Sequence, residues 1–172
     1  TKLALYESIN NSNGMFFLNK DDLNIYNSCN IKSDKVISYS MNDMNSNFIG
    51  DLSEIDSGTI SINNNSFNVP YHTTAFAYNF LASYSIAITF GVDSSAVQNV
   101  LNQFELPEGR GDYLNINSTI VINDSYNANL ESMISGISQL KHINKKEGRN
   151  ILVLGDMLEL GNRSEYNHKK LG

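Results

Sequence analysis

The sequence predicts an α/β protein in two parts, and three observations lead to this prediction. Short β-rich runs bounded by Asn, Asp, Gly and Ser occupy residues 15–62, and two helical patterns follow them. After Pro107 the pattern changes to two short strands, a helix and a further strand. We therefore place a boundary near Leu106, with one domain over residues 1–106 and a second over residues 107–172.

The first part is expected to form a sheet that contains a hairpin. Four runs rich in β-forming residues lie between turn residues, and Asp56-Ser57-Gly58 is a predicted turn before the last run. The four predicted strands are Met15–Leu18, Lys35–Tyr39, Phe48–Leu52 and Thr59–Ile62.

Two predicted helices complete this part. Between Thr73 and Phe90, apolar and aromatic residues recur at every fourth position, and Gly91 is placed to end the helix. The recurring residues are Phe76, Phe80, Tyr84 and Ile88. The second helix follows Asp93, a typical N-terminal cap, and ends before Pro107. Its predicted buried stripe consists of Ala96, Val97, Val100, Leu101 and Phe104.

The second part is typical of a strand–helix–strand unit. The predicted elements are strands Tyr113–Ile116 and Thr119–Asn123, a helix over Leu130–His142, and a strand over Asn150–Leu154. Such units are parallel and right-handed, and they bind ligands outside the carboxyl ends of their strands, where Asp124 and Asp156 fall. The last residues read as the start of a helix, and both ends of the sequence look cut, so we expect a fragment of a longer protein.

Composition disfavours several classes of function. The 172 residues include 18 acidic and 12 basic side chains, a formal charge of −6 that disfavours binding to nucleic acid or to an anionic membrane. The longest apolar stretch, Ala75–Ile88, contains polar residues and is shorter than the roughly 18 apolar residues of a membrane span, so no membrane insertion is expected. The single cysteine, Cys29, excludes an intramolecular disulfide and favours a cytoplasmic location.

Two segments combine residues that can bind a polar ligand. The segment Asn123–Asn129 places a carboxylate, two hydroxyls and amides in the turn between a strand and a helix, where a carboxylate can accept hydrogen bonds from a ribose diol. Alternatively, Asp124 and Asn129 only satisfy the turn and cap the helix. The segment Leu154–Gly161 has the same layout, and its alternative is a plain loop.

A third segment could approach a phosphate. In Glu108-Gly109-Arg110-Gly111, flexible backbone flanks a guanidinium, although a solvated surface arginine is the alternative. The sequence contains no GxxxxGK[ST] phosphate loop, so the chain alone is not expected to turn over ATP. Its three histidines and Cys29 have no recognisable zinc spacing.

Taken in order, these motifs resemble the Mur ligase family, and within it the branch that adds D-alanyl-D-alanine. Two motifs separated by one helix carry the resemblance, and shorter segments along the chain support it. The two main motifs are Asp124–Asn129 with Ser132-Met133, and Val153–Gly161 followed by His168. The supporting segments are Gly109-Arg110, Leu18–Asp22, and Lys2 followed by Leu5-Tyr6.

The resemblance implies the second half of a central ATP-binding domain joined to the first half of a Rossmann-like C-terminal domain. It further implies an ATP- and Mg²⁺-dependent ligase that joins UDP-MurNAc-tripeptide and D-alanyl-D-alanine through an acyl phosphate, in peptidoglycan precursor synthesis. Full-length relatives suggest a monomer. Neither a nucleic-acid partner nor membrane insertion is expected.

Roles for individual residues also follow from the resemblance alone. Lys2 matches the lysine that is carbamylated and binds a second magnesium, and Arg110 the arginine that reaches the ATP phosphates. Asp124 matches the ribose ligand. The nucleotide side of the cleft would include Asn79, Tyr126, Asn127 and Asn129, and the dipeptide side Asp156 and His168.

The sequence departs from the family pattern where the long helix opens. Relatives carry a histidine and an asparagine that face adenine, and here Ala75 and Phe76 replace them, whereas Asn79 is retained. Ala4 replaces the glutamate that usually follows the carbamylated lysine. These changes motivate an alternative interpretation, in which the protein is a non-catalytic Mur-like nucleotide-binding or scaffold protein.

Overall fold

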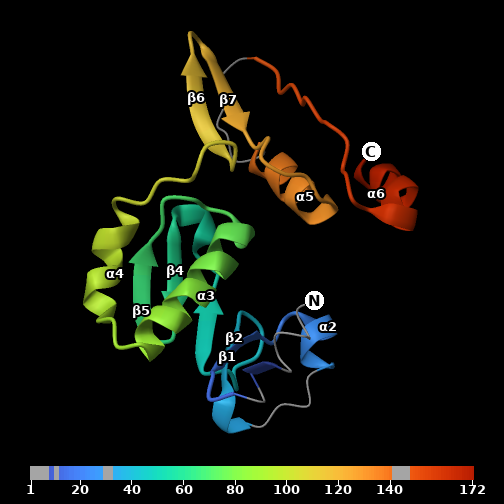
Figure 1. Cartoon of the computed structure of the whole chain (residues 1–172). Coiled ribbons are helices and arrows are strands. Elements are labelled where there is room, and N and C mark those ends of the chain that lie inside the picture. Colours follow the sequence, from blue (N-terminus) through green and yellow to red (C-terminus); the bar gives the residue numbers. More distant parts are fainter. Residues whose placement is uncertain (1–7, 10–11, 29–32, 141–147) are drawn as a thin grey trace. The chain divides into compact units, whose positions relative to one another are not determined.

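The computed structural model describes residues 8–9, 12–28, 33–140 and 148–172. The chain forms two compact units, Thr1–Phe104 and Glu105–Gly172 (Figure 1). Lys2, Ala4 and Cys29 lie outside the described residues. None of the described helices is long and apolar enough to cross a membrane.

The first unit contains a five-stranded mixed sheet in the order β1-β2-β3-β4-β5. The first three strands are parallel, and β3, β4 and β5 pair in antiparallel fashion. The strands are β1 (Phe16–Asn19), β2 (Val36–Ser40), β3 (Phe48–Asp51), β4 (Thr59–Ile62) and β5 (Asn65–Asn68). All four predicted strands are therefore present, within one residue at each end, and β5 is an additional strand.

Two longer helices pack on this sheet. Helix α3 (Thr74–Thr89) begins at Thr73, whose hydroxyl accepts a hydrogen bond from the Phe76 N–H, and it contacts β1, β2 and β3. Helix α4 (Ser94–Leu101) is capped by Asp93, as predicted, and contacts β5. Shorter turns of helix are α2 (Leu23–Tyr26), η1 (Ser33–Lys35) and η2 (Ile55–Ser57).

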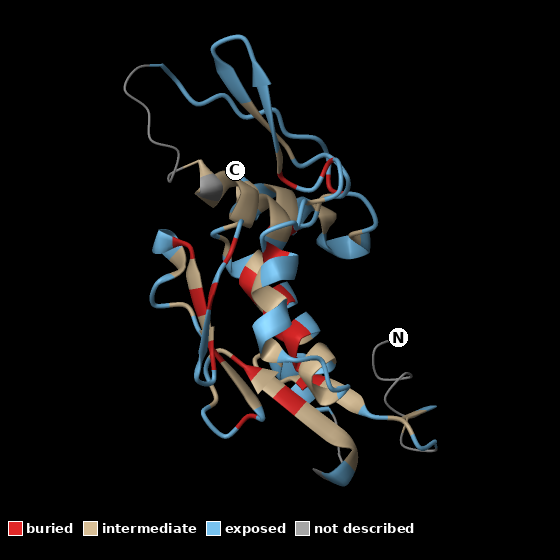
Figure 2. Ribbon diagram, turned by 90° about the vertical axis from the view of Figure 1, so that its left-hand side faces the viewer, coloured by how far each residue is buried: buried red, intermediate tan, exposed pale blue. Residues whose placement is uncertain are grey.

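The buried core of the first unit lies between helix α3 and the sheet. Figure 2 shows buried residues along α3 and on the strands beside it. Phe67, Phe80 and Tyr84 form an aromatic cluster at the centre of this core, with edge-to-face rings 5.2–6.0 Å apart. The core residues are Ile60, Ile62, Phe67, Val69, Ala77, Phe80, Leu81, Tyr84 and Leu101.

The second unit consists of a hairpin and two described helices. Strands β6 (Asp112–Ile116) and β7 (Thr119–Asn123) pair in antiparallel register around Asn117, which has φ 54. Helix α5 (Leu130–Gln139) contacts α6 (Ser164–Leu171), which follows η3 (Gly161–Arg163). The mixed α/β class is thus confirmed.

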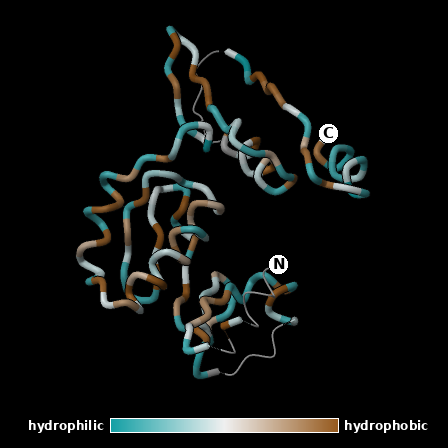
Figure 3. Tube along the Cα trace, in the orientation of Figure 1, coloured by the Kyte–Doolittle hydropathy of each residue, from teal (hydrophilic) through white to brown (hydrophobic). Residues whose placement is uncertain are grey.

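The predicted strand–helix–strand unit is wrong in this structure. The hairpin strands and α5 are present, but Asn150–Leu154 forms no strand and offers β7 no parallel partner. The apolar run remains exposed, with Val153 93% exposed, and Figure 3 shows it as a hydrophobic stretch ahead of α6. A run of β-forming residues becomes a strand only when a neighbouring strand supplies its hydrogen-bond ladder, and no described segment does so here.

Candidate functional site

Two loops of the second unit are joined around Arg110. The Gly111 N–H donates a hydrogen bond to the Asn123 carbonyl at 2.8 Å, and the Tyr126 N–H donates to the Gly109 carbonyl at 2.9 Å. Gly109 has φ 77, and a Cβ atom there would lie 3.2 Å from the Tyr126 nitrogen. The approach of the two loops therefore depends on glycine at position 109.

Arg110 projects from this junction over the ring of Tyr126. Its guanidinium carbon lies 4.0 Å from the ring centroid, which is a cation–π contact. Both side chains are exposed, with Tyr126 at 66%. The contact therefore fixes a cation in a position that solvent, or a solute, can reach.

Asp124 supplies a carboxylate to the same junction. Burial raises its pKa, the positive charge of Arg110 opposes that shift, and the negative charge of Asp112 adds to it. The side chain lies against α5, since a Cβ on Gly136 would be 3.3 Å from Asp124 Oδ2. No described residue donates a hydrogen bond to this carboxylate, so its oxygens remain open to a donor from a ligand.

Asn129 has a structural role at the start of α5. Its Oδ1 accepts from the Ser132 N–H at 2.9 Å, while Ser132 Oγ accepts from the Asn129 N–H at 3.1 Å. This is a reciprocal capping box. The neighbouring Asn127 Oδ1 accepts from the Ala128 N–H at 2.8 Å, and Asn127 is exposed. The capping interpretation thus holds for Asn129 and does not describe Asp124.

Asp156, in the loop before η3, lies close to His168 on α6. His168 Nδ1 lies 2.8 Å from the Ser164 carbonyl, and Nε2 lies 3.1 Å from the Met157 N–H. Since a carbonyl only accepts and an N–H only donates, these contacts fit a neutral imidazole with its proton on Nδ1. Asp156 Oδ1 is 3.9 Å from Nε2, but this approach is not an ion pair in that state. His168 therefore ties the loop at Met157 to α6, and Asp156 is exposed.

Asn79, also predicted as a site residue, belongs to the first unit. Asn79 is exposed on α3 of the first unit. Phe76, at one departure from the family pattern, packs against the rings of Tyr71 and Phe104, with centroids 5.5 and 5.7 Å away. Ala75 beside it is exposed. The described part of the chain brings together no three His, Cys, Asp or Glu side chains that could hold a metal ion.

Sequence reasoning missed a polar network at the carboxyl ends of β1 and β2. Asp21 accepts hydrogen bonds from the Ser40 hydroxyl at 2.6 Å, the Met41 N–H at 2.7 Å and the Tyr78 hydroxyl at 3.0 Å. Burial raises the pKa of Asp21, but these hydrogen bonds outweigh it and hold the pKa below its usual value. Burial and the Asp21 carboxylate raise the pKa of Tyr78 to about 12.

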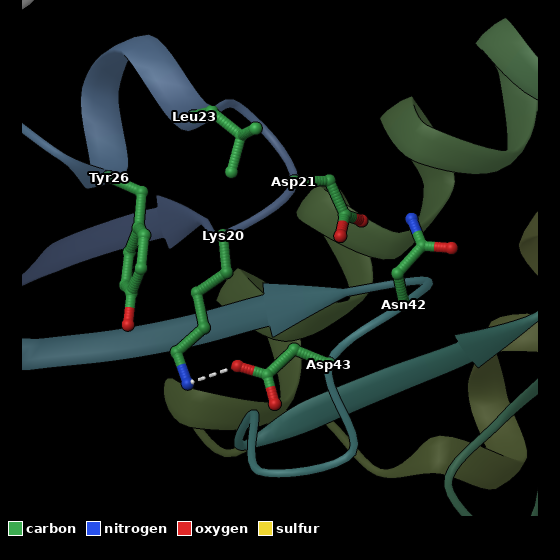
Figure 4. Close-up of a pocket in the computed structure, with 6 residues that line it drawn as sticks. All are labelled: Lys20, Asp21, Leu23, Tyr26, Asn42 and Asp43. Carbon is green, nitrogen blue, oxygen red and sulfur yellow. Dashed lines mark hydrogen bonds and ion pairs between the residues drawn. The ribbon is translucent and has the colours of Figure 1, made fainter.

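A hollow of about 390 Å³ adjoins this network (Figure 4). Lys20 on its wall is held by Asp43 Oδ2 at 2.9 Å and by the Asn45 carbonyl at 3.3 Å. The lining residues are Lys20, Asp21, Leu23, Tyr26, Asn42 and Asp43. The carboxylates and the ammonium are occupied by partners within the protein, so the arrangement holds the loops after β1 and β2 in place. The Asn19–Asp22 segment was the available signal, because polar residues directly follow a strand there.

Comparisons with known proteins match up to 93% of the chain. Residues 109–172 match the family described as Mur ligase, glutamate ligase domain. The UDP-N-acetylmuramoyl-tripeptide–D-alanyl-D-alanine ligase of Buchnera aphidicola subsp. Baizongia pistaciae is 30% identical over 171 residues, covering 93% of this chain and 36% of the relative. The ligase of the same name from Bacillus subtilis is 32% identical over 126 residues, covering 71% of this chain and 27% of the relative.

Solved structures show the same fold. MurF from Acinetobacter baumannii matches 80% of this chain and 30% of its own at 22% identity, with a TM-score of 0.68. MurF from Thermotoga maritima, solved in complex with ADP, matches 93% of this chain and 38% of its own at 18% identity and the same TM-score. The chain spans about a third of the length of the relatives it matches. The second unit therefore matches a Mur ligase domain, and relatives named as Mur ligases align across both units.

Proposed function

We propose that this chain is part of an ATP-dependent ligase that adds D-alanyl-D-alanine to UDP-MurNAc-tripeptide in peptidoglycan precursor synthesis. The observation that carries the proposal is the 30% identity, over 93% of the chain, to a relative with that printed activity. We assign residues 1–106 to part of the central ATP-binding domain and residues 107–172 to part of the C-terminal ligase domain. We place the reaction in the cytoplasm and propose that the full-length protein is a monomer.

The proposed reaction has two steps. The tripeptide carboxylate attacks the γ-phosphorus of ATP, so that an acyl phosphate forms and ADP leaves. The amine of D-alanyl-D-alanine then attacks the acyl carbon, phosphate departs, and the amine loses a proton as the peptide bond forms. Both steps develop negative charge on oxygen, which cationic groups stabilise.

The junction in the second unit supplies groups suited to a nucleotide. We assign Arg110 to the ATP phosphates, because its guanidinium is exposed and a contact with a ring face leaves its N–H donors available. Asp124 is assigned to the ribose hydroxyls, because no described residue donates to its carboxylate. We place Asn79, Tyr126, Asn127 and Asn129 on the nucleotide side, and Asp156 and His168 on the dipeptide side.

We propose Lys2, as a carbamate, as one of the magnesium ligands. A carbamate on Lys2 would supply anionic oxygen ligands, which Mg²⁺ prefers. The described residues contain no cluster of three metal-binding side chains, and the sequence has no GxxxxGK[ST] phosphate loop. The chain by itself is therefore expected to lack ATP turnover.

The test is an ADP-release assay on the complete protein in which this sequence occurs. With Mg²⁺ and UDP-MurNAc-tripeptide present, we expect ADP release that depends on D-alanyl-D-alanine and falls strongly in the Arg110→Ala variant. Folded protein that releases no ADP in response to the dipeptide would contradict the ligase. ATP binding without turnover would instead support the non-catalytic alternative, for which the packing of Phe76 among Tyr71 and Phe104 is the relevant observation.

A further inference from the structure

We infer that Tyr126 is a positioning residue for Arg110. The Tyr126 ring keeps the Arg110 guanidinium apart from Asp124 and directs it to the phosphate end of the nucleotide. This inference rests on the proposed ATP site. It explains how Arg110 and Asp124, which carry opposite charges, remain available for the phosphates and the ribose. Tyr126 acts through Arg110 and needs no contact of its own with the nucleotide.

The first support is the electrostatic relationship between Arg110 and Asp124. The arginine is close enough to act on the Asp124 carboxyl, yet no ion pair within 4.0 Å joins the two among the described residues. A direct ion pair would leave neither group available to a nucleotide, because the guanidinium N–H donors would bind the carboxylate oxygens. The ring offers Arg110 a competing partner that occupies none of those donors or oxygens.

The second support is the backbone that carries the two side chains. The hydrogen bonds from Gly111 to Asn123 and from Tyr126 to Gly109 lie on either side of Arg110 and join its loop to the loop of Tyr126. Gly109 N–H also donates to Asp112 Oδ1 at 2.5 Å, which holds the first loop against β6. The ring and the guanidinium therefore start from a fixed separation, so their contact requires little further ordering.

The main test is a double-mutant cycle on ATP affinity in the complete protein. We expect Tyr126→Phe to bind ATP within about twofold of the wild type, since the ring face is kept. Tyr126→Leu should weaken binding about two- to fivefold, the range that an exposed cation–π contact supports. In an Arg110→Ala background, Tyr126→Leu should cause no further loss. Tyr113→Leu is the matched control. Tyr113 is a half-exposed tyrosine of the β6–β7 hairpin, which precedes the Tyr126 loop, and its ring contacts no arginine among the described residues.

A second measurement separates this inference from the ATP site itself. In the nucleotide-free protein, the Arg110 side-chain protons should show a ring-current shift in NMR spectra that Tyr126→Leu removes and Tyr113→Leu does not. An additive cycle, or an unshifted Arg110, would overturn the positioning role. Wild-type protein that shows the shift but binds no ATP would contradict the proposed function and leave the pairing of the two side chains standing.

Discussion

The Tyr78 hydroxyl donates a hydrogen bond to Asp21 Oδ2 at 3.0 Å, across 57 positions of sequence. It joins helix α3 to the loop that follows β1, and the same carboxylate also binds the end of β2 through Ser40 and Met41. One side chain thereby connects three elements of the first unit. This relationship makes Asp21 a structural acid rather than a candidate ligand group.

Removing the hydroxyl should destabilise the first unit. Tyr78→Phe deletes a donor to a charged, partly buried acceptor, so we expect the free energy of unfolding to fall by about 1–2 kcal/mol. Urea unfolding of the complete protein, followed by a probe in this unit, measures the change. Tyr26→Phe is the control, because Tyr26 is 44% exposed and its hydroxyl has no hydrogen bond among the described contacts. Equal losses in the two variants would contradict the assigned role.

The same pair predicts two pH windows. Because the folded pKa of Tyr78 is raised to about 12, its contribution to stability is complete below the unfolded pKa of about 10 and is lost as the pH rises towards 12. Because the folded pKa of Asp21 is lowered, its contribution is present above an unfolded pKa of about 3.9 and is lost as the pH falls through the folded value. Tyrosinate absorbance should show a late-titrating group that disappears in Tyr78→Phe. The Tyr39→Phe control should retain it, although burial also raises the pKa of Tyr39.

Local sequence patterns predicted most of the first unit because its strands and helices carry their own signals. Strand β5 was missed because only Phe67 of its four residues is apolar, and Asn63 with φ 52 makes the preceding turn without a glycine. Asn150–Leu154 was predicted as a strand on composition, but pairing decides strand formation and no described segment pairs with it.

The candidate site was likewise predictable only in part from the sequence. Glycines around Arg110 and the polar turn at Asp124 are visible in the sequence, so both residues were singled out as candidates. The contact between Arg110 and Tyr126 was not predictable, because it depends on the β6–β7 hairpin bringing two loops together. The Asp21–Tyr78 contact likewise depends on tertiary packing across the unit.

The Gly109 junction should be sensitive to a single methyl group. Gly109→Ala places a side chain in left-handed backbone, at a cost of about 1–2 kcal/mol, and brings its Cβ within 3.2 Å of the Tyr126 nitrogen. We expect both a loss of stability and weaker ATP binding in the complete protein. Gly91→Ala is the matched control, because Gly91 has φ 86 but no described atom within 4 Å of the place that an added methyl group would take. The Gly91→Ala variant should lose stability while its ATP affinity is unchanged. Similar losses of affinity in both variants would contradict a role of the Gly109 junction in ATP binding.

Asp124 should distinguish nucleotides by their ribose. Asp124→Asn removes the charge that strengthens hydrogen bonds from the ribose hydroxyls, so we expect ATP affinity in the complete protein to fall about tenfold. The loss should be smaller with 2′-deoxyATP, because one of the two donors is already absent. Glu131→Gln makes the same change of charge in the exposed first turn of α5 and should leave affinity for both nucleotides unaltered. Calorimetric titration with the two nucleotides measures these differences. A penalty that is equal for both would place the carboxylate away from the 2′-hydroxyl, and no penalty at all would remove Asp124 from the nucleotide site.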